Sequence, residues 1–253
     1  MAAPHHGAVA VRPAIGAARL VLAIESATLR PSVALLAGEE ILALRVAPQG
    51  ASAAAVMLPA IEAVLEEAGA ALGDIGLFAL AIGPGSFTGL RVGLATLKGL
   101  AFESERPVVP VPTLAALCLA AGSAEAPVAA LLDARRGEVY AAAYGPAAPA
   151  PAEAELLPEG LYRLLDVAAR LRRGCRVTGD GAPLLSAAHA AAGLPAPTEV
   201  VHPPAAPAVG RLALRLLALG RARTAAELVP RYLRRAEAEA RRTGEPLENE
   251  KPF

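Results

Sequence analysis

Three short apolar runs open the patterned part of the chain. They cover residues 20–24, 32–37 and 41–46, and a Pro-containing turn separates the first run from the second. Short runs rich in Val, Leu and Ile between turn residues are typical of β-strands. Because few residues separate these runs, the pattern predicts an antiparallel meander.

The spacing of the apolar residues changes from residue 52 onward. Apolar side chains then recur three and four positions apart, at Val56, Met57, Ile61, Val64, Leu65 and Ala68. Glutamates fall mainly on another side of a helix with this spacing, and the pattern ends at Gly69. A stripe of this kind predicts an amphipathic helix.

The next apolar run, residues 77–82, stops abruptly at a glycine-rich segment, residues 83–89. Helical spacing follows over residues 90–102, so the predicted order is strand, glycine loop and helix. The run 108–111 predicts another strand, and Thr113 is suited to cap the helix that follows it.

The second half of the chain repeats this order less clearly. Residues 128–132 predict a strand, 133–137 a turn and 138–144 a returning strand. Two related α/β halves summarise the pattern. The predicted division is a disordered N-terminal extension over residues 1–18, a first lobe over 19–111, a second lobe over 112–235 and a charged C-terminal tail over 236–253.

Composition narrows the class of protein. Basic and acidic residues number 24 each, so no surplus of positive charge indicates nucleic-acid binding. Gly, Pro or charged residues interrupt every apolar stretch before it reaches a membrane-spanning length, although mean hydropathy is +0.44. Two cysteines without metal-ligand spacing favour reduced thiols in a cytoplasmic protein. The basic N-terminus keeps an organellar transit peptide open as an alternative.

The glycine loop is the segment with the clearest candidate chemistry. Gly83, Gly85, Ser86, Thr88 and Gly89 stand between a predicted buried strand and a helix. Backbone N–H groups in such a loop can bind phosphate or the phosphates of a nucleotide. Equally, the glycines can serve a tight turn in which Ser86 or Thr88 caps the helix. The residues alone leave both interpretations open.

Two other polar segments are weaker candidates. Glu25 and Ser26 follow the first strand, where they could orient a metal-bound phosphate, although a turn with a solvated glutamate is favoured. The charged segment 133–138 is expected to be a solvated hairpin rather than a catalytic cluster. His189 and His202 are isolated, so neither a metal site nor a catalytic triad can be assembled, and no metal or catalytic residue is predicted.

Several motifs taken together resemble the TsaB (YeaZ) family. They are Leu22-Ala-Ile-Glu-Ser26, Leu58-Pro59, Ile82-Gly-Pro-Gly-Ser-Phe-Thr-Gly-Leu-Arg-Val-Gly93, Lys98-Gly-Leu-Ala101, Pro112-Thr-Leu114, Leu132-Asp-Ala-Arg-Arg-Gly-Glu-Val-Tyr140 and Pro230-Arg-Tyr-Leu-Arg234. The resemblance implies a two-lobed α/β fold of the actin, sugar-kinase and Hsp70 (ASKHA) type, with a mixed sheet and packed helices in each lobe.

The family resemblance also implies an indirect role. TsaB proteins are degenerate relatives of TsaD, which transfers threonylcarbamoyl to the adenosine beside the anticodon of tRNA, in t6A biosynthesis. TsaD carries a His-x-x-x-His metal pair, but the corresponding residues 51–56 contain no histidine. Family members usually have Asp where Glu25 stands. The resemblance therefore implies a non-catalytic subunit without a cofactor of its own, and ATP or ADP with Mg²⁺ would bind only in the complex.

The expected partners are TsaD in a heterodimer, the TsaE ATPase and a second copy of the chain, with tRNA reached through the complex. In the family, two first-lobe helices form the contact surface, which here are about residues 52–68 and 90–102. The predicted interface residues are Met57, Leu58, Ile61, Gly93, Ala95, Leu97 and Gly99. The alternative for each is that it faces its own sheet.

Two other functions compete with the scaffold. One is a small ATPase or kinase of the same two-lobed class, which would use the glycine loop and Glu25. The other is a peptidase, for which the sequence offers no nucleophile–base pair. The sequence leaves open the oligomeric state, nucleotide binding by the loop, the residues that contact tRNA and the expression of residues 1–18.

Overall fold

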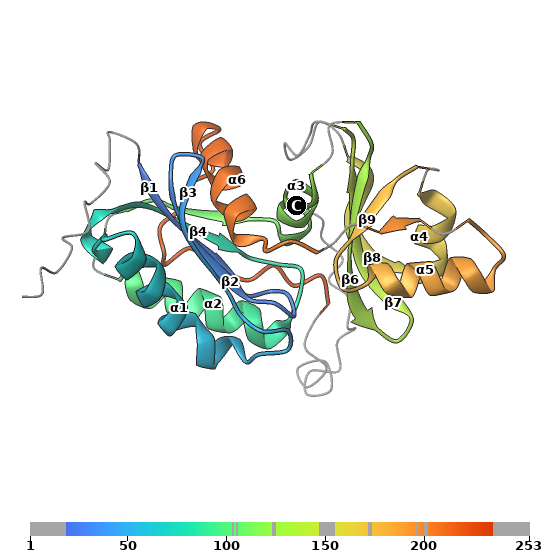
Figure 1. Ribbon diagram of the computed structural model, residues 1–253, viewed down its shortest axis with the longest axis horizontal. Helices are drawn as coiled ribbons and strands as arrows, with labels where there is room; N and C mark the ends of the chain where they lie inside the picture. Colours follow the sequence, from blue (N-terminus) through green and yellow to red (C-terminus); the bar gives the residue numbers. More distant parts are fainter. Residues whose placement is uncertain are drawn as a thin grey trace, which may run out of the picture.

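The computed structural model describes residues 19–102, 104, 106–122, 125–146, 155–171, 174–195, 197–199 and 202–234. The predicted N-terminal extension and charged C-terminal tail lie outside these residues. The described residues form two lobes side by side (Figure 1).

The first lobe is built on a five-stranded mixed sheet. Its meander is β1 (Leu20–Glu25), β2 (Ser32–Ala37) and β3 (Glu40–Val46), as the apolar runs predict. Two strands parallel to β1 continue the sheet, β4 (Ile75–Ala81) and β5 (Val108–Val111). The strand order is β3-β2-β1-β4-β5.

The second lobe repeats this topology. Its strands are β6 (Val128–Arg135), β7 (Glu138–Tyr144), β8 (Glu155–Arg163), β9 (Arg176–Thr178) and β10 (Thr198–Glu199). Their order, β10-β9-β6-β7-β8, again places an antiparallel meander on one side of the first strand and parallel strands on the other. This repeat confirms the two-lobed fold of the actin, sugar-kinase and Hsp70 type.

Helices cover the outer face of each sheet. In the first lobe these are α1 (Ala53–Glu67) and α2 (Phe87–Leu100), and a short 3₁₀ helix, η1 (Leu72–Asp74), precedes β4. In the second lobe they are α4 (Leu164–Arg170) and α5 (Ala182–Ala191). No helix in the described part of the chain combines the length and apolar character needed to cross a bilayer.

The third helix of each repeat lies between the lobes. α3 (Thr113–Ala121) packs on the second sheet, whereas α6 (Ala206–Ala218) packs on β1 and β2 of the first (Figure 1). The two helices also contact each other, so one apolar core spans both lobes. The predicted second lobe, 112–235, thus includes a helix that packs on the first lobe. An amphipathic pattern reveals that a helix has an apolar face, but not which sheet that face covers.

Gly210 allows α6 to lie close to the first sheet. A Cβ atom at this position would lie 2.6 Å from Cδ1 of Leu36 and 3.3 Å from Cβ of Ala23, and Leu36 is fully buried. By contrast, a Cβ atom added at Gly99 of α2 would have no heavy atom within 4 Å. The two helical glycines therefore differ in the space around them.

We expect Gly210→Val to lower the free energy of unfolding by about 1–3 kcal/mol, because the added methyl groups overpack the α6–sheet contact. Gly99→Ala is the matched control and should raise it by up to about 1 kcal/mol through helix propensity. Urea unfolding of the isolated chain measures both. Equal stability of the Gly210→Val variant and the unaltered chain would contradict the α6 packing.

Candidate functional site

The predicted polar segments meet at the carboxyl ends of neighbouring strands. β1 and β4 are adjacent and parallel, so Glu25 and Ser26 after β1 lie beside the glycine loop after β4. Ligands of open α/β sheets bind at such strand ends. The structure therefore brings these predicted site residues together, although they are far apart in the sequence.

Glu25 is buried rather than solvated, contrary to the turn with an exposed glutamate that the sequence favours. One carboxylate oxygen accepts hydrogen bonds from the backbone N–H groups of Ala27 (2.6 Å) and Thr28 (2.9 Å). The other accepts one from Oγ1 of Thr28 at 2.7 Å. Burial raises the pKa of Glu25 from 4.5 to about 7, although the hydrogen bonds act to lower it. The negative charge of Asp180 raises the pKa further. Both oxygens are thus used to hold the turn.

Glycines of the loop and of α2 pack directly on this turn. A Cβ atom at Gly85 would overlap the carbonyl oxygen of Ala27, and one at Gly89 would overlap that of Ser26. A Cβ atom at Gly93 would overlap Oγ of Ser26. That hydroxyl donates a 2.9 Å hydrogen bond to the carbonyl oxygen of Gly89. The two segments therefore approach too closely for any residue larger than glycine at these three positions.

Several N–H groups of the glycine loop already donate within the protein. Gly83 donates to Oγ1 of Thr113 (3.0 Å), and Ser86 donates to the carbonyl oxygen of Ala27 (2.7 Å). Oγ of Ser86 caps α2 by accepting from the N–H of Gly89 at 3.2 Å. Thr113 binds the loop instead of capping α3, which begins after Pro112 without a side-chain cap. This geometry favours the turn interpretation, and phosphate binding stays a prediction.

Thr88, the remaining predicted loop residue, is exposed in the first turn of α2. Its backbone continues the helix that Ser86 caps. Thr88 therefore lies on the surface beside the loop rather than within the contact between the loop and the Glu25 turn.

The second lobe contributes its own acidic side chains. Oδ1 of Asp180 accepts a 2.9 Å hydrogen bond from the N–H of Asp133, and Asp133 forms a 3.0 Å ion pair with Arg135. Burial raises the pKa of Asp180. Among the described residues, no three His, Cys, Asp or Glu side chains lie close enough to hold a metal ion. Sequence reasoning missed Asp180, although Gly179 and Gly181 flank it after a strand, as the glycine loop follows β4.

The predicted interface residues separate into two groups. Met57, Ile61, Gly93 and Leu97 are buried in the first lobe, which favours for these four the alternative that they face their own sheet. They belong to the side of each helix that faces the sheet. The other three, Leu58, Ala95 and Gly99, are exposed, and Leu58 is 52% exposed.

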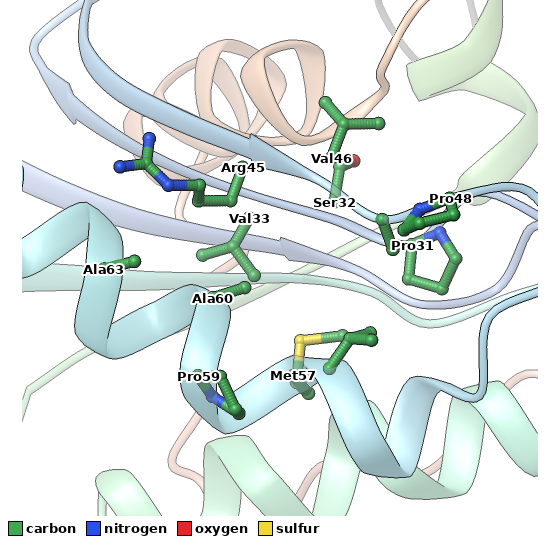
Figure 2. A pocket seen from close by; sticks show the side chains of 12 residues that line it. Pro31, Ser32, Val33, Arg45, Val46, Pro48, Met57, Pro59, Ala60 and Ala63 are labelled. Atoms are coloured by element: carbon green, nitrogen blue, oxygen red, sulfur yellow. The ribbon is translucent and has the colours of Figure 1, made fainter.

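A separate pocket of about 270 Å³ lies between α1 and the β2–β3 edge of the sheet (Figure 2). Its lining is mainly apolar and includes Pro31, Val33, Val46, Val56, Met57 and Ala60. The charged residue of the lining is Arg45, which pairs with Glu67 of α1. Such a lining suits an apolar group rather than a phosphate chain.

Comparison with known proteins gives consistent relatives. A family model described as TsaD, tRNA N6-adenosine threonylcarbamoyltransferase, matches residues 45–149. The tRNA threonylcarbamoyladenosine biosynthesis protein TsaB of Haemophilus influenzae is 40% identical over 123 residues, 47% of this chain and 51% of the relative. TsaB of Bacillus subtilis is 29% identical over 124 residues, which are 49% of this chain and 54% of the relative. The chain thus spans about half the length of these curated relatives.

A solved structure extends the likeness over most of the chain. YeaZ from Pseudomonas aeruginosa superposes with a TM-score of 0.68 at 30% identity. The superposition covers 85% of this chain and 100% of the YeaZ chain. A second structure from the same organism, described as similar to peptidase YEAZ, gives 0.69 at 29% identity with the same coverage. A relative matched along its whole length at this identity shows the family, and the chain belongs to the TsaB (YeaZ) family.

Proposed function

We propose that the chain is a non-catalytic subunit that binds TsaD and supports the transfer of threonylcarbamoyl to the adenosine next to the anticodon of tRNA. The observation that carries this proposal is the contact between the Glu25 turn and the glycine loop. The Glu25 carboxylate is used there within its own turn, whereas the N–H of Ser86 and the hydroxyl of Ser26 join the turn to the glycine loop.

The chemistry at Glu25 supports the absence of catalysis by this chain. A metal-assisted transfer needs ligands with free lone pairs directed at the ion. Both Glu25 oxygens accept hydrogen bonds within the turn, and the pKa of about 7 keeps much of the group protonated near neutral pH. The absence of histidine from residues 51–56 agrees with this, since the TsaD metal pair occupies that stretch.

The exposed side of α1 and α2 supports docking of a partner. The two helices are in contact, and Leu58 of α1 and Ala95 and Gly99 of α2 are exposed. Small residues let a partner helix approach closely, while Leu58 offers an apolar contact. The residues matched by the TsaD family model, 45–149, include both helices. Two chains of related fold can therefore pair through equivalent helices.

In this proposal the remaining components act through the complex. The TsaE ATPase joins the TsaD-bound chain, and ATP or ADP with Mg²⁺ binds only in the assembled complex. Substrate tRNA is likewise reached through the complex, because this chain has no net positive charge to attract it alone. A homodimer through the same helices is the state expected without TsaD.

The first prediction concerns the docking surface. Leu58→Asp should weaken binding to TsaD from the same organism about tenfold or more, because a charge would be buried at an apolar contact. Leu184→Asp is the matched control, since Leu184 lies on α5 of the other lobe and is 40% exposed. Co-elution with TsaD and threonylcarbamoyl transfer to tRNA are measured. Failure of the unaltered chain to co-elute with TsaD or stimulate the transfer would overturn the proposed function.

The second prediction concerns Glu25. Folding favours its protonated form because the pKa is raised from 4.5 to about 7, so this stabilisation is complete below pH 4.5 and lost as pH rises through 7. Between pH 4.5 and 8 the chain should lose about 2–3 kcal/mol relative to Glu25→Gln, which stays neutral.

Urea unfolding at several pH values measures this difference. Glu62→Gln is the control, because Glu62 is exposed on α1 and its replacement should leave the pH dependence as it is. Parallel pH profiles for the unaltered chain and Glu25→Gln would contradict the buried, protonated carboxyl.

A further inference from the structure

The segment after α6 is attached to the first lobe by its backbone. Arg223 and Val108 exchange two backbone hydrogen bonds, of 2.8 and 3.0 Å, at the edge of the first sheet. Nζ of Lys98 donates to the carbonyl oxygen of Ala226 at 3.2 Å. Farther along, the N–H of Arg231 donates to the carbonyl oxygen of Ile82 at 2.7 Å. This segment, orange-red in Figure 1, crosses the first lobe and ends between the lobes.

An aromatic contact fixes the end of the segment to α2. The ring of Tyr232 stacks on Phe87 with centroids 4.9 Å apart. Nε of Arg91 donates to the Tyr232 hydroxyl at 3.0 Å, and its guanidinium lies 4.0 Å from the centroid of the Phe87 ring. The backbone and the tyrosine are therefore both held by the first lobe.

The arginines on either side of Tyr232 reach the second lobe. Arg231 forms a 2.6 Å ion pair with Glu159 of β8, and these side chains are only 16% and 4% exposed. Arg234 pairs with Glu138 of β7 and donates a 2.6 Å hydrogen bond to the carbonyl oxygen of Ala134. Ion pairs with so little exposure are weakly screened by salt, unlike ordinary surface pairs.

We propose that residues 230–234 form an interlobe clamp, which fixes the angle between the lobes. One side of the clamp is the Arg231 backbone and the Tyr232 ring on the first lobe, and the other is the pair of arginines on the second. Enzymes that close around ligands need their domains to rotate about a hinge. The clamp opposes such a rotation and keeps the chain in one shape for a partner to bind.

The clamp goes beyond the proposed function and is tested on the isolated full-length chain, so its failure would leave TsaD binding undecided. Spin labels are placed at Glu62→Cys on α1 and Ala187→Cys on α5, both exposed positions. The native Cys118 and Cys175 are buried, and burial raises the pKa of both thiols, that of Cys175 to about 11, so they resist labelling.

Pulsed electron–electron double resonance then measures the distribution of distances between the two spin labels, one on each lobe. The unaltered clamp predicts one narrow distribution, and Arg231→Gln combined with Arg234→Gln should broaden it and shift it to longer distances. Arg163→Gln combined with Arg170→Gln is the control, because it removes the same charge from exposed positions on the second lobe alone. The control should match the unaltered chain.

A distribution that stays narrow and unshifted in the double clamp variant, with native circular dichroism, overturns the proposal, since the shared α3–α6 core would then fix the lobes by itself. Should that variant fail to fold, Glu138→Gln combined with Glu159→Gln is measured in its place. It removes the two charges that pair with Arg231 and Arg234 but leaves the hydrogen bond from Arg234 to Ala134. Broadening supports the clamp, and an unchanged distribution again overturns it.

Discussion

The glycine loop and the Glu25 turn approach each other so closely that their contact fixes how the ends of β1 and β4 meet. Gly85, Gly89 and Gly93 leave no room for a Cβ atom against Ser26 and Ala27, so the ends of β1 and β4 are interlocked. The contact also sets the start of α2. The orientation of α2 in turn decides which of its residues face the sheet and which are exposed.

The local spacing of apolar residues was enough to predict much of the fold. The meander, the helices α1 and α2 and the repeat in the second half follow from short-range spacing, because strand and helix periods are properties of neighbouring residues. The packing of α6 on the opposite lobe could not be predicted in this way. It depends on contacts such as Gly210 with Leu36, whose partners lie far apart in the sequence.

The sequence predicted where the site residues lie better than it predicted their chemical environment. The strand ends place Glu25, Ser26 and the glycine loop together, but the sequence could not reveal that the Glu25 carboxylate is buried and satisfied by Ala27 and Thr28. Nor could it orient the helices. Apolar residues lie on more than one side of α1, so Met57 and Leu58 are adjacent in sequence, yet one is buried and the other exposed.

The Glu25 turn packs directly on the glycine loop, so the isolated chain should not bind nucleotide there. Titration calorimetry of the isolated chain with ATP and Mg²⁺ tests it most directly. We expect no saturable binding tighter than about 1 mM, because the N–H groups of Gly83, Ser86 and Gly89 and both Glu25 oxygens already form hydrogen bonds within the chain. A micromolar dissociation constant accompanied by turnover would contradict it and favour a small kinase or ATPase.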